Sequence, residues 1–292
     1  MDIKLPVEIL QIIFQQLKRQ PELSVLSRVC RQWHVVATSL LYRCPTLESE
    51  RQMKSFCQSS ETARAYIQQL DLSTVSSWLT DEMLLSLIPE AQNSRANKFI
   101  RSLGLANCNR LSCQAIFAFL KSCSLDHVLQ EVVFANCLLS DQIISLLSQS
   151  RSVRKLNICN TMIQPCVDME TSHCLGPFAK ACENLEELDM SFCAWVDQHT
   201  MDTICRLRHL RKLSIRWCHR VPIQSIFHIV QHLSSLQSLD VRHVNGANHP
   251  DIIRFVLYLR PSLGEVHFTQ EQKIMTCARR LAGGDVEMAV SG

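Results

Sequence analysis

A chain of 292 residues that is 47% hydrophobic is long enough to bury one or two sizeable cores, which excludes a disordered protein. Its net charge of +3 comes from 30 basic and 27 acidic residues without a run of like charge, and predicts neither a nucleic-acid nor a membrane partner. Fifteen cysteines in a long chain without an export signal are typical of reduced thiols, not of a disulfide framework.

Cellular location and metal binding are constrained by what the sequence lacks. No apolar stretch approaches the roughly 18 residues of a membrane-spanning helix, and the N-terminus has none of the features of a signal peptide. No C-x-x-C pair exists and the eleven histidines are scattered, so we predict no metal and no cofactor. We expect an intracellular protein, cytoplasmic or nuclear or both.

The first predicted element is an amphipathic helix in LPVEILQIIFQQL, from Leu5 to Leu17. Pro6 suits the first turn, where its missing N–H costs nothing. Apolar side chains recur at helical spacing, namely Ile9, Leu10, Ile13, Phe14 and Leu17. A helix this short is not stable by itself, so its apolar face needs a packing partner.

A second apolar stripe follows, in a segment that includes LSRVCRQWHVVATSLLYR from Leu26. The stripe steps by 3, 4, 3 and 4 residues through Leu23, Leu26, Cys30, Trp33 and Ala37. This spacing predicts one helix with a single apolar face, of the kind that docks in a groove of a partner.

The rest of the chain carries eight copies of the pattern L-x-x-L-x-L-x-x-C, whose starts lie 24 to 33 residues apart. Four copies have cysteine in the ninth place: IRSLGLANC from Ile100, LQEVVFANC from Leu129, LEELDMSFC from Leu185 and LRKLSIRWC from Leu210. Four are degenerate: IQQLDLSTV from Ile67, VRKLNICNT from Val153, LQSLDVRHV from Leu236 and LGEVHFTQE from Leu263.

Each copy predicts a short strand whose two inner apolar residues point into a core, with a small residue in the ninth place where the chain turns. Segments of helical period follow several strands: CQAIFAFLKSC from Cys113, DQIISLLSQ from Asp141, IQSIFHIVQHL from Ile223 and DIIRFVLYL from Asp251. The predicted fold is therefore α/β, with N-terminal helices followed by a curved solenoid that has a parallel sheet on its concave face and helices on its convex face.

These repeats resemble the cysteine-containing class of leucine-rich repeats, and the first 44 residues resemble an F-box. The F-box resemblance rests on LPVEILQIIFQQL and on residues that stand where that family has its V-C-x-x-W core and terminal apolar residues, namely Val29, Cys30, Trp33, Leu41 and Tyr42. The expected division is an F-box over 1–44, a linker or solenoid cap over 45–66, about eight repeats over 67–273 and a tail over 274–292.

The resemblance implies a non-catalytic substrate receptor that binds a Skp-family adaptor and, through it, a cullin-RING scaffold of a ubiquitin ligase. By family position, the adaptor-binding residues are expected to be Leu5, Pro6, Ile9, Leu10, Ile13, Phe14, Val29, Cys30 and Trp33. The N-terminal helices could instead serve only as a cap over the first repeat, because a cap also needs an apolar stripe.

Target recognition is expected on the solenoid, because strand alternation puts the third, fifth and seventh residues of each motif on the concave face. The charged candidates are Glu187, Asp189, Lys212, Arg216, Asp240 and Arg242. The eighth places add an aromatic patch of Phe192, Trp217 and His243. A solvated charged face, and rings turned towards the convex side, are the alternatives.

Other segments carry weaker expectations. Two long insertions, 89–98 and 161–177, are expected to form loops, and the tail after Ile274 shows no pattern. The chain has no phosphate-binding loop, nucleophile elbow or H-E-x-x-H pair, so little supports an enzyme. A repeat scaffold that works without a ligase remains the main alternative function.

Overall fold

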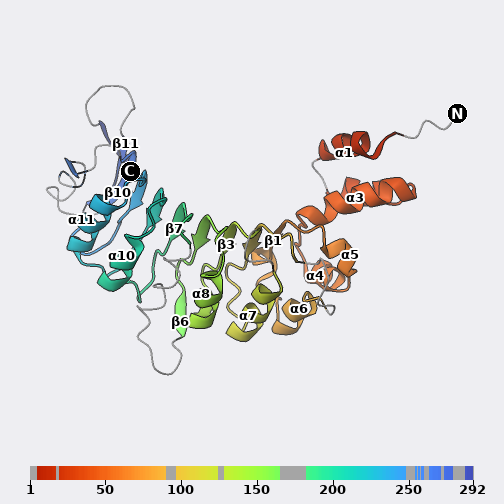
Figure 1. Cartoon of the computed structure of the whole chain (residues 1–292), viewed down its shortest axis with the longest axis horizontal. Coiled ribbons are helices and arrows are strands. Elements are labelled where there is room, and N and C mark those ends of the chain that lie inside the picture. The colour runs from red at the N-terminus through yellow and green to blue at the C-terminus, as the bar shows by residue number, and fades with distance from the viewer. Residues whose placement is uncertain are drawn as a thin grey trace.

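The computed structural model has a helical unit at its N-terminal end, followed by an arc of stacked repeats (Figure 1). It describes residues 5–17, 20–89, 97–123, 128–164, 182–247, 263–270, 273–278 and 287–291, together with 254, 256, 258 and 259. Within these residues, no helix is long and apolar enough to cross a membrane.

The helical unit contains three helices, α1 (Val7–Gln15), α2 (Gln20–Leu26) and α3 (Arg31–Arg43), and α3 packs against both of the others. The prediction of one helix from Leu23 to Ala37 is wrong, because the chain turns between α2 and α3. Cys30 has an extended backbone there, with φ −158° and ψ 170°, and ends the helical path. The apolar stripe is thus shared between two helices.

Eight short strands form the parallel part of the main sheet, in the order β1-β2-β3-β5-β7-β8-β9-β10. Their bounds are β1 (Gln69–Asp71), β2 (Ser102–Gly104), β3 (Glu131–Val133), β5 (Lys155–Asn157), β7 (Glu187–Asp189), β8 (Lys212–Ser214), β9 (Ser238–Asp240) and β10 (Glu265–Gln270). One strand comes from each of the eight sequence motifs, so the predicted solenoid fold is confirmed.

The register of the sheet follows the motif. The fourth residue of each copy lies opposite the fourth residue of the next, through Leu70, Leu103, Val132, Leu156, Leu188, Leu213, Leu239 and Val266. All eight side chains are buried. A slip by one residue would turn this apolar row towards solvent, so burial fixes the register.

Helices line the other side of the arc, α6 (Asp81–Ser86), α7 (Cys113–Ser122), α8 (Asp141–Leu147), α10 (Gln198–Ile204) and α11 (Ile223–His232). Several begin at a side chain that accepts a hydrogen bond from a first-turn N–H. Ser112 accepts from the N–H of Ala115 at 3.2 Å, and Asp197 accepts from that of Thr200 at 3.0 Å. Four of these five helices start at such a cap, and α11 starts after Pro222 without one.

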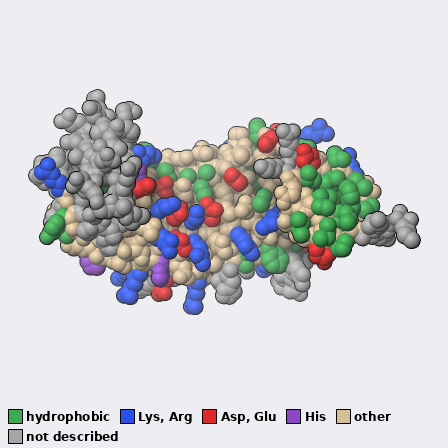
Figure 2. Space-filling model, turned by 90° about the horizontal axis from the view of Figure 1, so that it is seen from above, with side chains coloured by type: hydrophobic (Ala, Val, Ile, Leu, Met, Phe, Trp, Pro, Cys, Tyr) green, Lys and Arg blue, Asp and Glu red, His purple; other side chains and the backbone are tan. Residues whose placement is uncertain are grey.

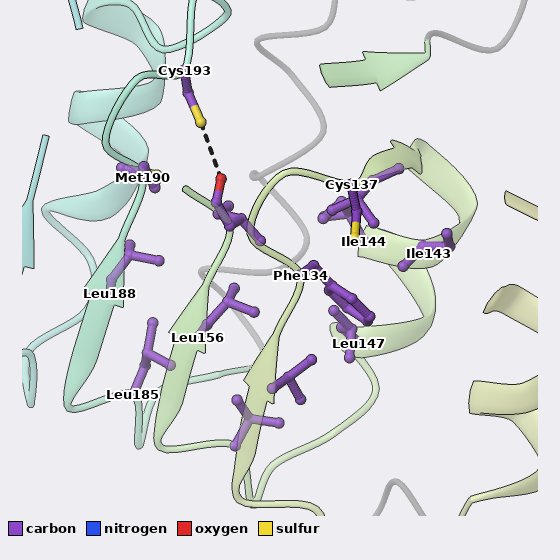
Figure 3. Packing of buried hydrophobic residues seen from close by; sticks show 14 of the residues in the cluster. Phe134, Cys137, Ile143, Ile144, Leu147, Leu156, Leu185, Leu188, Met190 and Cys193 are labelled. Carbon is purple, nitrogen blue, oxygen red and sulfur yellow. Dashed lines mark hydrogen bonds between the residues drawn. The ribbon is translucent and has the colours of Figure 1, made fainter. Parts of the chain in front are cut away.

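The interior of the repeats is filled by the inner strand residues and the apolar faces of these helices (Figure 3). Phe134 and Leu156 from neighbouring repeats are packed among Ile144 and Leu147 of α8, and all four are almost fully buried. Burial of such side chains contributes roughly 1.5 to 3 kcal/mol each, so the repeats are stabilised by this continuous core.

Two helices occupy the segment expected as a linker or cap, α4 (Glu50–Cys57) and α5 (Glu61–Arg64). Met53 and Phe56 of α4 belong to the same core as the repeats, and the Phe56 ring stacks on Tyr42 of α3 at 6.1 Å. The N–H of Gln68 also donates to the carbonyl of Arg43 at 2.9 Å. These contacts join the helical unit to the first repeat.

The sheet continues beyond the eighth motif with two antiparallel strands, β11 (Lys273–Ala278) and β12 (Glu287–Ser291). Both lie in the segment where the sequence shows no pattern. Two further strands, β4 (Leu138–Ser140) and β6 (Met162–Gln164), form a small parallel sheet. The predicted loops lie outside the described residues over 90–96 and 165–177.

Candidate functional site

The helical unit has a small core of its own, made of Leu10, Phe14, Leu23, Val36 and Ala37. Each of these side chains is at most 6% exposed. Trp33 packs on this core with its ring edge-to-face with Phe14, at 5.2 Å between centroids. The unit is thus held together by one side of each helix.

The other side of these helices is apolar as well and faces solvent. The exposed apolar residues are Leu5, Val7, Ile9, Ile12, Ile13, Val25, Val29 and Val35, and we call this set the apolar face. Figure 2 shows hydrophobic side chains gathered at this end of the molecule. A soluble domain rarely leaves such an area uncovered, and a patch of this kind typically marks an interaction site.

The residues expected to bind an adaptor divide between these two sides. Leu5, Pro6, Ile9, Ile13, Val29 and Cys30 are exposed. Leu10 and Phe14 are only 1% and 2% exposed, so they form the core and do not belong to a partner surface as the structure has it. Trp33 is partly buried against the same core. This corrects the expected set.

Sequence reasoning missed four members of the apolar face, Val7, Ile12, Val25 and Val35. A signal was present, because Ile12 and Ile13 extend the apolar arc of α1 well beyond the stripe that one core needs. An apolar arc that is wider than one core needs indicates two contact surfaces on the helix. On α1 these are the core of the helical unit on one side and an exposed surface on the other.

The concave face of the solenoid carries charged side chains at the predicted third and fifth places. Glu187 of β7 lies between two lysines of the neighbouring strands, 3.4 Å from Lys155 and 3.2 Å from Lys212. These residues line an open groove of about 380 Å³ that also includes Asp189, Asp240 and Glu131. The charges largely pair with one another.

The pair at Asp240 and Arg242 has fixed geometry. The Arg242 guanidinium donates to the Asp240 carboxylate through Nε at 2.9 Å and also through an Nη atom, as a two-point fork. Hydrogen bonding to Asp240 raises the pKa of Arg242 above its usual value. Most of the charge of Arg242 is therefore balanced inside the protein.

The eighth places of the repeats share an unusual backbone conformation. Six of them have a positive φ between 51° and 62°, at Asn107, Asn136, Asn160, Phe192, Trp217 and His243. Asparagine tolerates this left-handed region, and the three asparagines form a ladder of side-chain hydrogen bonds at 2.6 and 2.7 Å. Bulky rings rarely adopt it.

Phe192, Trp217 and His243 stack in a row, which we call the ring strip. The Phe192 and Trp217 rings are 6.0 Å apart with 12° between their planes, and Trp217 and His243 are 4.0 Å apart with 22°. Phe192 is 40% and Trp217 39% exposed. The structure thus brings together the three rings expected as a patch and leaves them open to solvent.

The ninth-place cysteines have a bonding role as well as a packing role. The Sγ of Cys137 lies 2.9 Å from the carbonyl oxygen of Leu105, and that of Cys193 lies 3.1 Å from that of Ile158, both in the preceding repeat (Figure 3). Burial raises the pKa of Cys137 to about 11. A thiol kept protonated in this way is not a nucleophile.

Cation-binding clusters are absent from the part of the chain that the structure describes. There, no group of three or more His, Cys, Asp or Glu side chains could hold a metal ion. The twelve cysteines from Cys30 to Cys218 whose side chains the structure describes are free thiols. The candidate sites of this molecule are therefore surfaces, namely the apolar face, the concave groove and the ring strip.

Comparison with known protein families gives a match for the helical unit. Residues 3–48 match the family model described as F-box-like, so the chain has an F-box-like domain at its N-terminus. This match spans α1, α2 and α3. No curated protein sequence matches the chain.

Three solved structures overlap in part with the molecule. An internalin from Listeria monocytogenes is 16% identical with a TM-score of 0.37, and the match covers 76% of this chain and 52% of that one. The TLR13-ssRNA13 complex is 15% identical with a TM-score of 0.38, and the match covers 64% of this chain and 27% of that one. The Rad7 and Elc1 complex of yeast is 14% identical with a TM-score of 0.32, and the match covers 89% of this chain and 87% of that one. This chain spans about half of the matched internalin chain. The fold of this chain is assigned from the sheet and helices described above.

Proposed function

We propose that this chain is a substrate-recognition subunit of a Skp-cullin-F-box ubiquitin ligase, with repeats of the cysteine-containing class. The observation that carries the proposal is the apolar face, which lies on the F-box-like region and remains uncovered. A Skp-family adaptor is its proposed partner, and a cullin-RING scaffold is reached through that adaptor. The proposed location, inside the cell, follows from this assembly.

The proposed adaptor contacts are the exposed members of the expected set together with those that the structure adds. Ile9, Ile12 and Ile13 are exposed on α1, with Ile9 and Ile13 beside the core side of the helix and Ile12 opposite it, so they widen its apolar surface. Val29 lies in the turn after α2 and Val35 lies on α3. Burial of side chains of this size against a partner is the usual source of binding energy at such a surface.

Target proteins are proposed to bind the solenoid through the concave charges and the ring strip. Catalysis by the chain itself is not part of the proposal. Its mechanism is proximity, because a target held on the solenoid has a high effective concentration near a ubiquitin carrier bound at the other end of the assembly. The proposed units keep the expected boundaries of 1–44, 45–66, 67–273 and 274–292.

Adaptor binding by the purified full-length chain tests the proposal directly. The Ile9→Asp, Ile13→Asp double variant is expected to bind a purified Skp-type adaptor at least about tenfold more weakly than the wild type, measured by titration calorimetry. Both positions are exposed, so the thermal midpoint of the variant should stay close to that of the wild type.

A matched control makes the same kind of substitution, an exposed apolar residue to Asp, at a position outside the helical unit. Leu85 of α6 is 41% exposed, close to the 43% and 46% of Ile9 and Ile13, but lies on the solenoid. Leu85→Asp should leave adaptor affinity unchanged. An adaptor that fails to bind the wild type, or that binds the double variant as tightly as the wild type, would contradict the proposal.

A further inference from the structure

The ring strip occupies backbone positions that do not suit its residues. Three repeats of the same solenoid place asparagine in the eighth position, where its short polar side chain tolerates a positive φ and extends the hydrogen-bonded ladder. Phe192 and Trp217 take up the same conformation, with φ of 61° and 60°, without that benefit, whereas His243, with φ of 60°, is of a residue type that tolerates it. Bulky side chains held in a sparsely populated conformation point to a use outside the fold.

The strip is shaped for contact with an extended partner. Its rings are close to parallel and follow one another across β7, β8 and β9, so their faces stack on one another and their exposed edges form a row along the solenoid. His219 adds an edge-to-face contact with Trp217 at 5.5 Å and borders the strip. Rigid rings of this kind bind a partner at low cost in conformational entropy.

One cation beside the strip, Arg216, forms no ion pair within 4.0 Å among the described residues. The Arg216 guanidinium lies over the Phe192 ring, 4.8 Å from its centroid, and its Nε is buried without a hydrogen-bond partner. The neighbouring Arg242 differs, because it is paired with Asp240. The Arg216 charge therefore has a ring contact but no carboxylate partner, and it lies beside the strip, where it would attract an anion.

From this combination we infer that the ring strip and Arg216 bind an extended acidic peptide segment of a target protein. An Asp or Glu carboxylate of the segment meets the Arg216 guanidinium, and a neighbouring apolar or proline side chain lies against Trp217. The inference rests on the proposed function in so far as the solenoid is the part that holds targets. It adds the chemical class of the target segment and the residues that select it.

Selection from a displayed library of random linear peptides of about twelve residues tests the inference, because such a library samples acidic, basic and apolar segments alike. Peptides are selected on the purified full-length chain and counter-selected on Trp217→Asn. Enriched sequences should share an Asp or Glu next to Leu, Pro, Phe or Tyr. Synthetic copies should bind Trp217→Asn and Arg216→Gln at least about tenfold more weakly than the wild type.

Asparagine is chosen as the replacement for Trp217 because it should preserve the fold. Asparagine occupies the same place in three repeats, so Trp217→Asn should keep the helical circular-dichroism signal of the wild type and a thermal midpoint within about 5 °C of it. Trp217→Phe retains a ring and should recover most of the peptide affinity. Arg208→Gln removes an exposed arginine that precedes β8 and should leave peptide binding unchanged.

Each other outcome overturns the inference. Failure to enrich any peptide, enrichment of basic peptides, or unchanged affinity for Trp217→Asn would each do so. Binding of a single-stranded oligouridine that depends on Trp217, without peptide enrichment, would assign the strip to nucleic acid. Adaptor affinity, measured on the same variants, should stay at the wild-type value, so a failure here is separate from a failure of the proposed adaptor contact.

Discussion

A single side chain links neighbouring repeats at the ninth place of the motif. Cys137 is 3% exposed, and its Sγ lies 2.9 Å from the carbonyl oxygen of Leu105. Thr161 stands in the same place of the next repeat and donates its hydroxyl to the carbonyl of Ile158, at 2.8 Å, within its own repeat. A small residue with a donor therefore adds a second hydrogen bond to a buried carbonyl group, because the carbonyl of Leu105 also accepts from the N–H of Cys108 at 3.2 Å and that of Ile158 also accepts from the Sγ of Cys193.

Replacement of the ninth-place residue should lower the free energy of unfolding most where the hydrogen-bond donor is lost. Cys137→Ala is expected to lower the free energy of unfolding by about 1 to 2 kcal/mol, since it leaves a small cavity and removes the hydrogen bond from Sγ to the carbonyl of Leu105. Urea unfolding of the purified chain measures this. Cys137→Thr should cost less because it keeps a donor, and the exposed Cys30→Ala should cost nothing. Equal midpoints for Cys137→Ala and Cys30→Ala would contradict this role.

Among the helices, α1 has the clearest separation between buried core residues and exposed apolar residues. Leu10 and Phe14 hold it to α2 and α3, and the exposed isoleucines on its other side are left for a partner. Periodicity alone did not separate these two sets, because both are apolar and lie only one or two residues apart along the helix. Their separation needs the positions of α2 and α3, which depend on the turn at 27–30 that the stripe pattern conceals.

Two arginine substitutions in α1 should therefore behave differently. Leu10→Arg places a charge in the core of the helical unit and is expected to destabilise that unit by about 3 kcal/mol or more. Limited proteolysis should then cleave within the first 44 residues. Ile12→Arg, at a side chain 57% exposed, should resist proteolysis like the wild type and lose only adaptor binding. Similar cleavage of both variants would show that the two sides are not distinct.

The repeats share one long core, separate from that of the helical unit, and its buried thiols titrate differently in the folded and unfolded chain. Burial raises the pKa of Cys108, Cys123, Cys182 and Cys218 to about 12 each, against 9.0 for an ordinary thiol. Above pH 9 the unfolded chain therefore loses thiol protons that the folded chain retains, and the unfolded state binds fewer protons. Below pH 9 both states are protonated and these groups make no difference.

The free energy of unfolding should consequently fall as the pH rises from 9 towards 12. Urea midpoints measured on both sides of pH 9 test this, with the Cys108→Thr, Cys218→Thr double variant as the control. Lysines and tyrosines titrate in both proteins alike, so the variant should show a smaller decrease. An identical pH dependence in the two proteins would contradict the assignment of the effect to buried thiols.

Much of the solenoid was predictable from sequence, because the motif that places Leu103, Val132 and Leu156 in register is the pattern that burial imposes. The ring strip was predictable as a set of residues but not as a strained one, since φ at Trp217 depends on the turn of a stacked repeat. Strands β11 and β12 carry no motif, and they pair through the backbone with an edge that only the folded sheet provides.

The row of eighth positions also has a consequence for how such a protein changes over generations. Every position in the row has the same backbone, points away from the leucine core and already differs between asparagine and aromatic residues. A ring gained at Asn160, or lost at Phe192, would lengthen, shorten or shift the strip by one repeat without repacking the interior. The row is thus a place where one substitution at a time can redirect the molecule to new targets while the solenoid itself is inherited unchanged.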